Sequence, residues 1–379
     1  MDTDNPMPRR WIFEGLLIRK YVSAFIGPGG VGKSSLAIAV GMSVALGKSL
    51  LALDHDDPHK IHKRGPVLYW NLEDPLEELL LRISGELKCR GINKAEIGAN
   101  FLAMSGRDFP LNLVPTDAKA SCDRRDITPI VQLLRDLGII LLIIDPYGNA
   151  HSGNPNDNAH MTAVLDQLRL IAEQADCAVL IVHHFRKGGQ SGDAEASLGA
   201  VMTTNGCRVV DSITAMTEDE AKALGIDPTK RRSYVKRSNA KLNLSAAPDE
   251  CEWYRFDGVS LDNVTDEYPD GDNVGVLTRW KALSPLLGLT WSDVSDILDQ
   301  IDIGMGGEYY TSDPKSKTRW VGALMMERLG LDDQQAKSLI KEWIKAGILA
   351  KDKYISQERH GQDTQRLVVR PKGRDELTR

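Results

Sequence analysis

Residues 27–34, GPGGVGKS, place four glycines and one lysine in the pattern G-x-x-x-x-G-K-[ST]. Glycine lets backbone N–H groups wrap around an anion, because it adopts positive φ angles at little steric cost. In such a loop the lysine amine reaches the β- and γ-phosphates of a nucleotide, and the serine hydroxyl coordinates Mg²⁺. We therefore expect Lys33 and Ser34 to act on phosphate and metal, with Ser35 on the α-phosphate side. The backbone contacts are expected from Gly27, Gly29, Gly30, Val31 and Gly32.

The segments on either side of this loop fit phosphate binding. An apolar run over residues 21–26 predicts a buried strand, and residues 34–46 predict a helix. The N-terminus of that helix would direct its dipole at the anion. A chance glycine-rich turn is the alternative, but it would not need a strand before it and a helix after it.

A phosphate loop also needs an acid for the metal ion, and Asp145 is the candidate. It ends GIILLIID (138–145), an unbroken apolar run typical of a strand buried on both faces. An acid in this place holds Mg²⁺ directly or through water. The alternative is an aspartate that only caps the loop after the strand. Pro146 follows instead of a second acid, so the group that activates the attacking water must lie elsewhere.

Two further strand ends carry polar side chains. Glu73, in WNLEDP (70–75), follows a predicted strand at residues 66–71 and can face the γ-phosphate, since parallel strands open onto one edge. Asp74 is its rival, although its place before Pro75 also suits a helix N-cap. His183 and His184 end the run CAVLIVHH (177–184). One of them can bond the γ-phosphate and signal its presence to the next loop, or both simply mark a strand exit.

Strand and helix patterns alternate through the first two-thirds of the chain, which predicts an α/β fold with a parallel sheet and helices on both faces. The other strands are expected at residues 66–71, 101–105, 138–145 and 177–183, and the other helices at 75–88, 126–137 and 158–175. Shorter strands are expected at 208–216, 233–238 and 253–256. Asp257-Gly258 predicts a hairpin turn after the last of these.

The acidic, turn-rich stretch DNVTDEYPDGDN (262–273) predicts a domain boundary. We expect one domain over residues 1–265, a linker over 266–275 and a second domain over 276–379. Helices at 291–301, 316–329 and 333–346, followed by strands at 348–356 and 365–369, predict a small winged-helix-like domain there.

Composition narrows the class of protein. The 42% of hydrophobic and 26% of charged residues are ordinary for a globular protein. The five cysteines are widely spaced, and we see neither an apolar run long enough for a membrane span nor a leader segment, so we expect a cytoplasmic protein without disulfides. The net charge of −6 argues against nucleic-acid binding. Residues 315–379, however, hold 15 lysines and arginines against 9 acids, which suits either a polyanion or solvent.

Four segments, GPGGVGKSS, LYWNLEDP, LLIIDPYG and VLIVHHFRKGG, occur in this order. Together they resemble the RecA-like ATPase core (AAA-25-like) of plasmid and phage RepA-type hexameric replicative helicases, over roughly residues 10–265. The resemblance implies ATP and Mg²⁺ as ligands, with a homo-hexameric ring around single-stranded DNA. It also implies Glu73 as the catalytic base and His184 as the γ-phosphate sensor.

The same resemblance implies cations supplied by a neighbouring subunit. Arg208, in TTNGCRVVDS, matches the family's arginine finger, and Lys241, in AKLN, matches a second such cation. Arg82, nine residues after Glu73, matches a further family arginine. Such a cation neutralises charge in the phosphoryl-transfer transition state. Several other basic residues are alternatives for this role, namely Lys230, Arg231, Arg232, Lys236 and Arg237.

DNA contacts are expected in two places. Arg186 and Lys187 follow the histidine pair in a basic loop that resembles the channel loops of RecA-like motors; an ordinary surface loop is the alternative. The C-terminal domain departs from the family. Its helix at 333–346 presents Lys337, Lys341 and Lys345 on one face, which suits DNA phosphates or a protein partner.

The sequence therefore predicts a DNA helicase or translocase that acts in replication of a plasmid, phage or other mobile element. Two other functions share its motifs. One is a non-motor regulator whose ATP cycle controls DNA or partner binding, and the other is a RecA-type recombination filament.

Overall fold

The computed structural model describes residues 6–52, 59–115, 125–152, 158–184, 206–224, 226, 228–244, 251–280, 291–305, 307–345, 347–356 and 363–370. The chain divides into two compact units. The first comprises Met1–Glu218 and Asp227–Lys281, and the second comprises Asp219–Ile226 and Ala282–Arg379.

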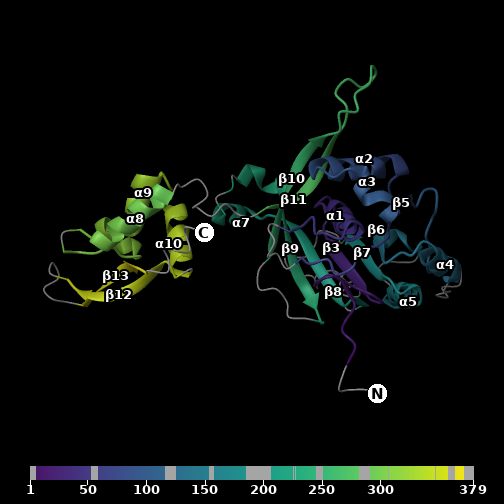
Figure 1. The fold of residues 1–379 in the computed structure, drawn as a ribbon, viewed down its shortest axis with the longest axis horizontal. Coiled ribbons are helices and arrows are strands. Elements are labelled where there is room, and N and C mark those ends of the chain that lie inside the picture. The colour runs from purple at the N-terminus through teal and green to yellow at the C-terminus, as the bar shows by residue number, and fades with distance from the viewer. Residues whose placement is uncertain are drawn as a thin grey trace. The chain divides into compact units, whose positions relative to one another are not determined.

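The first unit is built on a sheet that has nine strands in the described residues, in the order β11-β10-β9-β8-β3-β7-β6-β4-β5 (Figure 1). The strands from β8 to β5 run parallel to their neighbours, and those from β8 to β11 run antiparallel. The parallel strands are β3 (Val22–Gly27), β4 (Val67–Asn71), β5 (Phe101–Ser105), β6 (Leu141–Asp145), β7 (Ala178–His184) and β8 (Val209–Ala215). The antiparallel extension consists of β9 (Tyr234–Leu242), β10 (Glu252–Ser260) and β11 (Asn273–Trp280).

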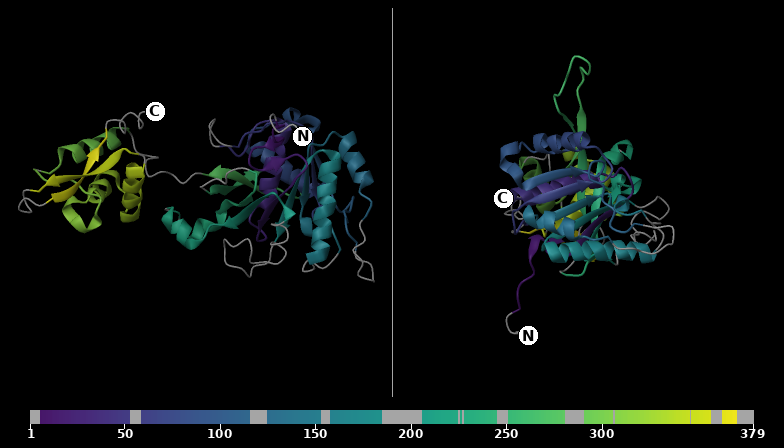
Figure 2. Two further views of the ribbon diagram at one scale, coloured as in Figure 1. Left: turned by 90° about the horizontal axis from the view of Figure 1, so that it is seen from below. Right: turned by 90° about the vertical axis from the view of Figure 1, so that its right-hand side faces the viewer.

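Helices cover both faces of the sheet (Figures 1 and 2). One face packs against α1 (Lys33–Leu46) and α2 (Leu76–Cys89), and the other packs against α4 (Thr128–Asp136) and α5 (Asn158–Ala175). Successive residues of β6 alternate between the two cores, with Leu141 and Ile143 in one and Leu142 and Ile144 in the other. This explains the unbroken apolar run, and it confirms the predicted α/β fold.

The β10–β11 hairpin corrects the predicted turn and domain boundary. β10 continues through Asp257 and Gly258, and Gly258 lies opposite Gly275 of β11. Asp257 accepts hydrogen bonds from Arg255 and from Thr278 across the ladder, which holds this dipeptide in the strand. The turn lies instead at residues 261–272, in a loop that projects away from the sheet (Figure 1). The expected linker at 266–275 is thus this loop and the start of β11, and the first unit extends to Lys281.

Among the described residues, the second unit holds α8 (Trp291–Ile303), η4 (Pro314–Arg319), α9 (Val321–Leu329), α10 (Asp333–Lys345) and the antiparallel strands β12 (Leu349–Ile355) and β13 (Asp363–Val369). Its core surrounds Trp343, which is 1% exposed. The buried Glu308 accepts hydrogen bonds from Arg319 and Ser356. The order of helices and hairpin follows the sequence expectation, except that the helix expected at 316–329 is split into η4 and α9.

The remaining elements are short. They are β1 (Trp11–Phe13), β2 (Leu17–Ile18), α3 (Lys94–Ile97), η1 (Gly98–Asn100), η2 (Tyr147–Asn149), α7 (Glu218–Ala223) and η3 (Pro228–Ser233). Of the helices that the structure describes, none combines the length and apolarity needed to cross a bilayer.

Candidate nucleotide site

The glycine-rich loop joins the central strand β3 to α1. Gly32 is the N-cap of α1 with φ 84°, and Gly30 has φ 76°, so both adopt the left-handed conformation that glycine accepts without strain. A Cβ atom on Gly27 would lie 2.1 Å from the carbonyl oxygen of Ile213 in β8. The strand, loop and helix expected around this motif are therefore present, and two of the glycines are required by backbone conformation and one by close packing.

Lys33 turns back into the loop. Its Nζ donates hydrogen bonds to the carbonyl oxygens of Gly27 (2.9 Å) and Pro28 (2.5 Å), and the residue is 2% exposed. Burial lowers the pKa of Lys33 to about 8, with the nearby Asp145 carboxylate opposing the shift. The amine is still mostly protonated at neutral pH, and it is positioned to exchange carbonyl oxygens for phosphate oxygens.

Asp145 ends β6 directly beneath the loop and is 1% exposed. Burial raises its pKa, while hydrogen bonds from Tyr69 and Ser34 and the charge of Lys33 lower it. The oxygens of Asp145 and Ser34 are hard donors that suit Mg²⁺. In the described residues no group of three or more His, Cys, Asp or Glu could hold a metal ion. The oxygen donors of Asp145 and Ser34 fit Mg²⁺, because this ion commonly takes one or two protein ligands and completes its shell with phosphate and water.

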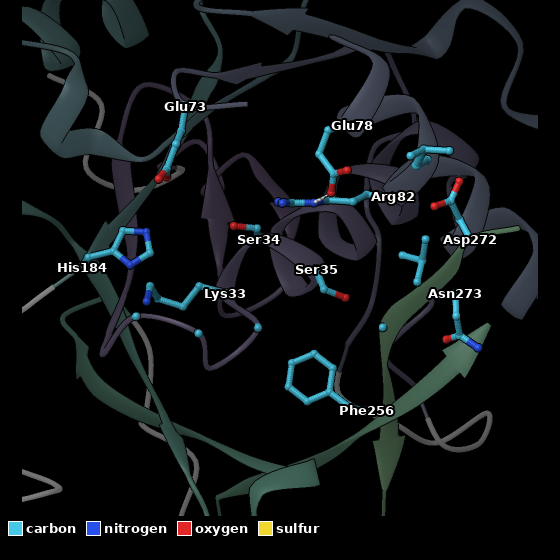
Figure 3. A pocket seen from close by; sticks show the side chains of 16 residues that line it. Lys33, Ser34, Ser35, Glu73, Glu78, Arg82, His184, Phe256, Asp272 and Asn273 are labelled. Atoms are coloured by element: carbon cyan, nitrogen blue, oxygen red, sulfur yellow. Dashed lines mark hydrogen bonds and ion pairs between the residues drawn. The ribbon is translucent and has the colours of Figure 1, made fainter. Parts of the chain in front are cut away.

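The carboxylates of Glu73 and Asp74 have different surroundings in the structure. The Asp74 carboxylate pairs with Arg82 of α2 at 3.0 Å. Asp74 is not the N-cap that we expected, because Pro75 occupies that position and no side chain caps the helix. Glu73 is exposed and lines the pocket above the loop (Figure 3). Within the described ranges no ion pair engages Glu73, so its exposed carboxylate faces the pocket without a competing cation.

The two histidines at the end of β7 also differ. His184 is accessible from the pocket, where partial desolvation and the charge of Lys33 lower its pKa to about 4. His183 is buried, and its ring lies 5.5 Å from that of Tyr147. Burial first, and then the neighbouring positive groups, lower the pKa of His183 to about 4 as well. Both rings are neutral at pH 7, and only His184 can reach a ligand in the pocket.

The pocket has a volume of about 660 Å³ and two distinct ends. Glu73 and His184 lie beside Lys33 at one end, and Ser35 separates them from Phe256 and Asn273 at the other (Figure 3). The second end is lined by residues that we had not assigned to the site: Glu78 and Leu81 of α2, Phe256 of β10, Asp272 of the hairpin loop, and Asn273, Val274 and Gly275 of β11.

The β10–β11 hairpin contacts the glycine-rich loop directly. A Cβ atom on Gly32 would lie 2.6 Å from both Phe256 and Leu277. Ser35 donates a hydrogen bond to the buried Glu86 (2.8 Å) and accepts one from the backbone N–H of Leu277 (3.0 Å). Its hydroxyl thus anchors the hairpin, in addition to facing the pocket where we expect the α-phosphate.

Comparison with known families agrees with this geometry. Residues 2–190 match the family model described as AAA domain, AAA_25. The chain carries a RecA-like P-loop ATPase domain. The match includes the glycine-rich loop, Glu73, Asp145 and His184, and it ends before β8. The strands that complete the pocket therefore lie beyond the matched residues.

Three solved structures share low similarity with the ATPase domain. They are a RadB recombinase (16% identity, 62% of this chain and 87% of that chain, TM-score 0.38), the flagellar accessory protein FlaH from Methanocaldococcus jannaschii (11%, 63% and 86%, 0.40) and a further structure of an isolated ATPase domain (12%, 63% and 82%, 0.41).

The candidate trans-acting cations lie in two different places. Arg208 precedes β8, and its N–H donates to Val22 at the start of β3, the end of the sheet opposite the ATPase loop. Lys241 lies next to it on β9. Partial burial lowers the pKa of Lys241, and the charges of Arg208 and Arg169 act in the same direction. Arg82 differs from its expected trans position, because it lines the pocket of its own chain and is held by Asp74 and Glu78.

Of the alternative cations, Arg237 is 7% exposed and is bound by Asp211 and Glu252. It therefore supports the sheet of its own chain. Lys236 lies over the ring of Trp253, and the others, Lys230, Arg231 and Arg232, lie on η3.

The expected DNA-contact residues are only partly described. Arg186 and Lys187 lie outside the described residues. On α10, Lys337 pairs with Asp333 at 2.6 Å and lies over the ring of Trp320, whereas Lys341 is exposed. The side chain of Lys345 lies outside the description. The opposite face of α10 is buried, as its spacing predicts, through Ala336, Leu339, Ile340 and Trp343.

Proposed function

We propose that the ATPase domain hydrolyses ATP with Mg²⁺ at the pocket above the glycine-rich loop. Lys33 would neutralise the β- and γ-phosphates, while Ser34 and Asp145 would hold the ion, which supplies charge neutralisation at the phosphates. Glu73 would accept the proton of the attacking water, and His184 would bond the γ-phosphate. The availability of Glu73, in contrast to the paired Asp74, supports this assignment.

The nucleoside would occupy the other end of the pocket. Phosphates bound at Lys33 and Ser34 extend past Ser35, so the ribose and base would lie between α2 and the hairpin. Phe256 offers a ring for stacking on the base, and Asn273 offers an amide for hydrogen bonds.

We further propose that neighbouring copies complete the site. The observation that carries this proposal is the clustering of Arg208 and Lys241 at the end of the sheet away from their own ATP pocket. Arg208 and Ile213, which lies beside the loop, are five steps apart along the chain, or about 17 Å of strand. These cations can act on the transition state of a neighbour but not on their own nucleotide. Head-to-tail contacts of this kind close into a ring, for which we propose a homo-hexamer.

The ring would move along single-stranded DNA, as a helicase or translocase of the RepA type in replication of a mobile element. Arg186 and Lys187 are the proposed channel contacts. Lys337, Lys341 and Lys345 of the winged-helix-like domain are the proposed contacts to duplex DNA. This part of the proposal is based on the motif resemblance and on the basic character of residues 315–379.

Mixing two inactive variants tests the shared site. Lys33→Ala lacks the phosphate lysine and Arg208→Ala lacks the trans cation, so each protein alone should lose ATPase activity. In an equimolar mixture about a quarter of random interfaces join an intact loop to an intact arginine, and activity should return to about that fraction. A mixture as inactive as its components would contradict the shared site.

Addition of DNA tests the proposal that the ATPase is a DNA motor. The ATPase rate of the wild-type protein should rise with single-stranded DNA, and a forked duplex should be unwound. If ATP is hydrolysed but DNA neither stimulates hydrolysis nor is unwound, the protein is an ATPase and the proposal of a DNA motor is wrong.

A second candidate is a non-motor regulator, favoured by the separate core of the second unit. Deletion of residues 282–379 keeps β11 and removes that core. Unwinding that survives the deletion would make the second unit accessory. Loss of partner or DNA binding, with no unwinding by either protein, would favour the regulator. Electron microscopy with ATP and single-stranded DNA separates rings from a recombination filament.

A further inference from the structure

A continuous chain of hydrogen bonds runs beneath the ATP pocket, from the loop that carries Glu73 to Asp145. The Oδ1 atom of Asn71 accepts hydrogen bonds from the backbone N–H groups of Glu73 (3.0 Å) and Asp74 (2.7 Å). The Nδ2 atom of Asn71 donates to the hydroxyl of Tyr69 at 3.2 Å. That hydroxyl donates to Oδ2 of Asp145 at 2.7 Å.

The strand register explains why these groups meet. β4 and β6 are parallel neighbours, and Asn71 lies opposite Asp145. Tyr69 and Asn71 are two residues apart on β4, so their side chains leave the same face of the sheet. Tyr69 is 0% exposed, Asn71 2% and Asp145 1%. Buried polar groups are costly unless they are hydrogen-bonded, and each member of this chain satisfies another.

The amide of Asn71 also fixes the direction of the chain. Its oxygen already accepts from two backbone N–H groups, so its nitrogen must face Tyr69 as the donor. The Tyr69 hydroxyl, which accepts from Asn71, is then left to donate its own hydrogen to Asp145. Its donation occupies Oδ2, and Oδ1 is left without this bond.

The backbone reinforces the same connection. The N–H of Leu72, the residue between Asn71 and Glu73, donates to the carbonyl oxygen of Asp145 at 2.7 Å. The Ser105 hydroxyl at the end of β5 donates to the carbonyl oxygen of Asp74 at 2.8 Å. The loop that carries the candidate base is thus tied to the acid-bearing strand β6 on one side and to β5 on the other.

We propose that Asn71 and Tyr69 are positioning residues, which set the place of Glu73 and the orientation of Asp145 through one hydrogen-bonded chain. This inference rests on the proposed function, because it assigns these two side chains a purpose in Mg²⁺ binding and hydrolysis. Neither residue touches the nucleotide. A change in either one should therefore act at both ends of the chain.

Tyr69→Phe tests the end near Asp145, because it removes one hydroxyl and keeps the ring. Loss of a hydrogen bond to a metal-binding side chain costs about 10- to 100-fold in metal affinity. We expect the Mg²⁺ concentration for half-maximal binding of a fluorescent ATP analogue to rise about tenfold. Binding of the analogue without Mg²⁺ should stay at the wild-type level. A Mg²⁺ requirement within about twofold of wild type would overturn the proposal.

Asn71→Leu tests the other end, because it removes both the acceptor and the donor at similar volume. We expect faster amide hydrogen exchange at Glu73 and Asp74, a lower kcat with little change in KM, and the same rise in Mg²⁺ requirement as in Tyr69→Phe. Exchange at the wild-type rate would overturn the proposal. Asn71→Ser serves the same test if the leucine variant does not fold, since its hydroxyl is too short to span both partners.

The double variant tests the connection itself. Residues in one hydrogen-bond network have non-additive effects. Tyr69→Phe with Asn71→Leu should therefore raise the Mg²⁺ requirement no more than the larger single change, whereas a product of the two single effects would contradict a single chain. Asn100→Leu is the matched control. Its amide donates to the Ala45 carbonyl outside the pocket, and Mg²⁺ dependence and exchange at Glu73 should not change.

Failure of the positioning proposal can be distinguished from failure of the proposed ATPase function. If Glu73→Gln hydrolyses ATP normally, Glu73 is not the base, yet the Mg²⁺ and exchange measurements still decide whether the chain positions both ends. If the wild-type protein binds no nucleotide, the proposed function fails before these variants are compared.

Discussion

The two ends of the ATP pocket differ in how they are built. The proposed phosphate end lies at the carboxyl ends of the parallel strands β3, β4, β6 and β7. Lys33, Glu73 and His184 line it, and the buried Asp145 is hydrogen-bonded to Ser34. The nucleoside end consists of α2 and an antiparallel hairpin at the far edge of the sheet, which supplies Phe256 and Asn273 from much later in the chain.

Because the two ends are built from different elements, we expect that substitutions can alter catalysis at the phosphate end and nucleotide recognition at the hairpin separately. At the phosphate end Lys33 and Asp145 are buried, while Glu73 and His184 line the pocket from strand ends in fixed register, which suits catalysis because the reacting atoms must be held in place. The hairpin would close the proposed nucleoside end and contribute contact area rather than chemistry. We therefore expect substitutions at the phosphate end to change kcat, and substitutions at the hairpin to change KM.

The largest effect is expected for Glu73→Gln. Loss of a general base typically costs about 10²–10⁴-fold, so we expect kcat to fall about 10³-fold while ATP binding persists. Single-turnover hydrolysis and equilibrium binding of ATP measure the two quantities. Asp74→Asn is the control, and its partly exposed pair with Arg82 should matter less than about fivefold. An equal loss of kcat in Glu73→Gln and Asp74→Asn would contradict the assignment of Glu73 as the base.

His184→Ala should lower kcat about 30-fold, since a hydrogen bond to a charged group is worth about 2 kcal/mol. The pKa of His184 is about 4, so the ring stays neutral above about pH 5 and its proton does not titrate in the neutral range. The ratio of wild-type to variant kcat/KM, which reports groups of the free enzyme, should therefore be constant between about pH 6 and pH 8. A ratio that changes about tenfold over that range would contradict a neutral sensor.

At the other end, Phe256→Ala should raise KM for ATP about tenfold, because stacking of a base on an aromatic ring is worth about 1–3 kcal/mol. We expect kcat to change little, and inorganic triphosphate to bind equally well to both proteins. A fall in kcat with unchanged KM would abolish the distinction between the two ends. Phe109→Ala removes an exposed ring that does not line this pocket, and it should leave KM unchanged.

The smallest effect is expected for Ser35→Ala. The change removes the bond to Glu86 and the acceptor for Leu277, and should lower the free energy of unfolding by about 1 kcal/mol. Chemical denaturation measures this loss. A modest rise in KM should accompany it, because the hairpin loses an anchor. An unchanged KM together with a lower kcat would place Ser35 with the phosphate end.

The sequence predicted the parallel part of the sheet well, for physical reasons that are local. Residues 139–144 are all apolar, and those in β6 are so because both of its faces are covered; residues 27–34 need glycine where the backbone takes positive φ or approaches β8. Such requirements leave a pattern within a short stretch of chain. The fold and the phosphate motif were therefore predictable from short segments.

The hairpin was not predictable in the same way. Asp257-Gly258 has the composition of a turn, but pairing with Gly275 and the bonds of Asp257 to Arg255 and Thr278 keep it within β10. The acidic loop that follows has the composition of a linker. Tertiary contacts, such as the packing of Phe256 and Leu277 against Gly32 and the bond from Leu277 to Ser35, show that β11 belongs to the first unit.

Arg82 shows the same limit for single residues. Its distance in sequence from Glu73 said nothing about which subunit's pocket it would enter. The helical spacing that links Arg82 to Glu78, and its pair with Asp74, hold it in the pocket of its own chain. Arg208 and Lys241 became neighbours through the antiparallel pairing of β8 with β9, which no local pattern indicates.

The position of β11 along the chain has one more consequence. The strand lines the pocket at Gly275 and ends at Trp280, and the second unit begins at Ala282. The covalent path from the pocket-lining Gly275 to the start of the second unit at Ala282 is thus about seven residues. A change in the order of this strand on ATP binding would therefore be transmitted along the backbone to the residue at which the second unit begins.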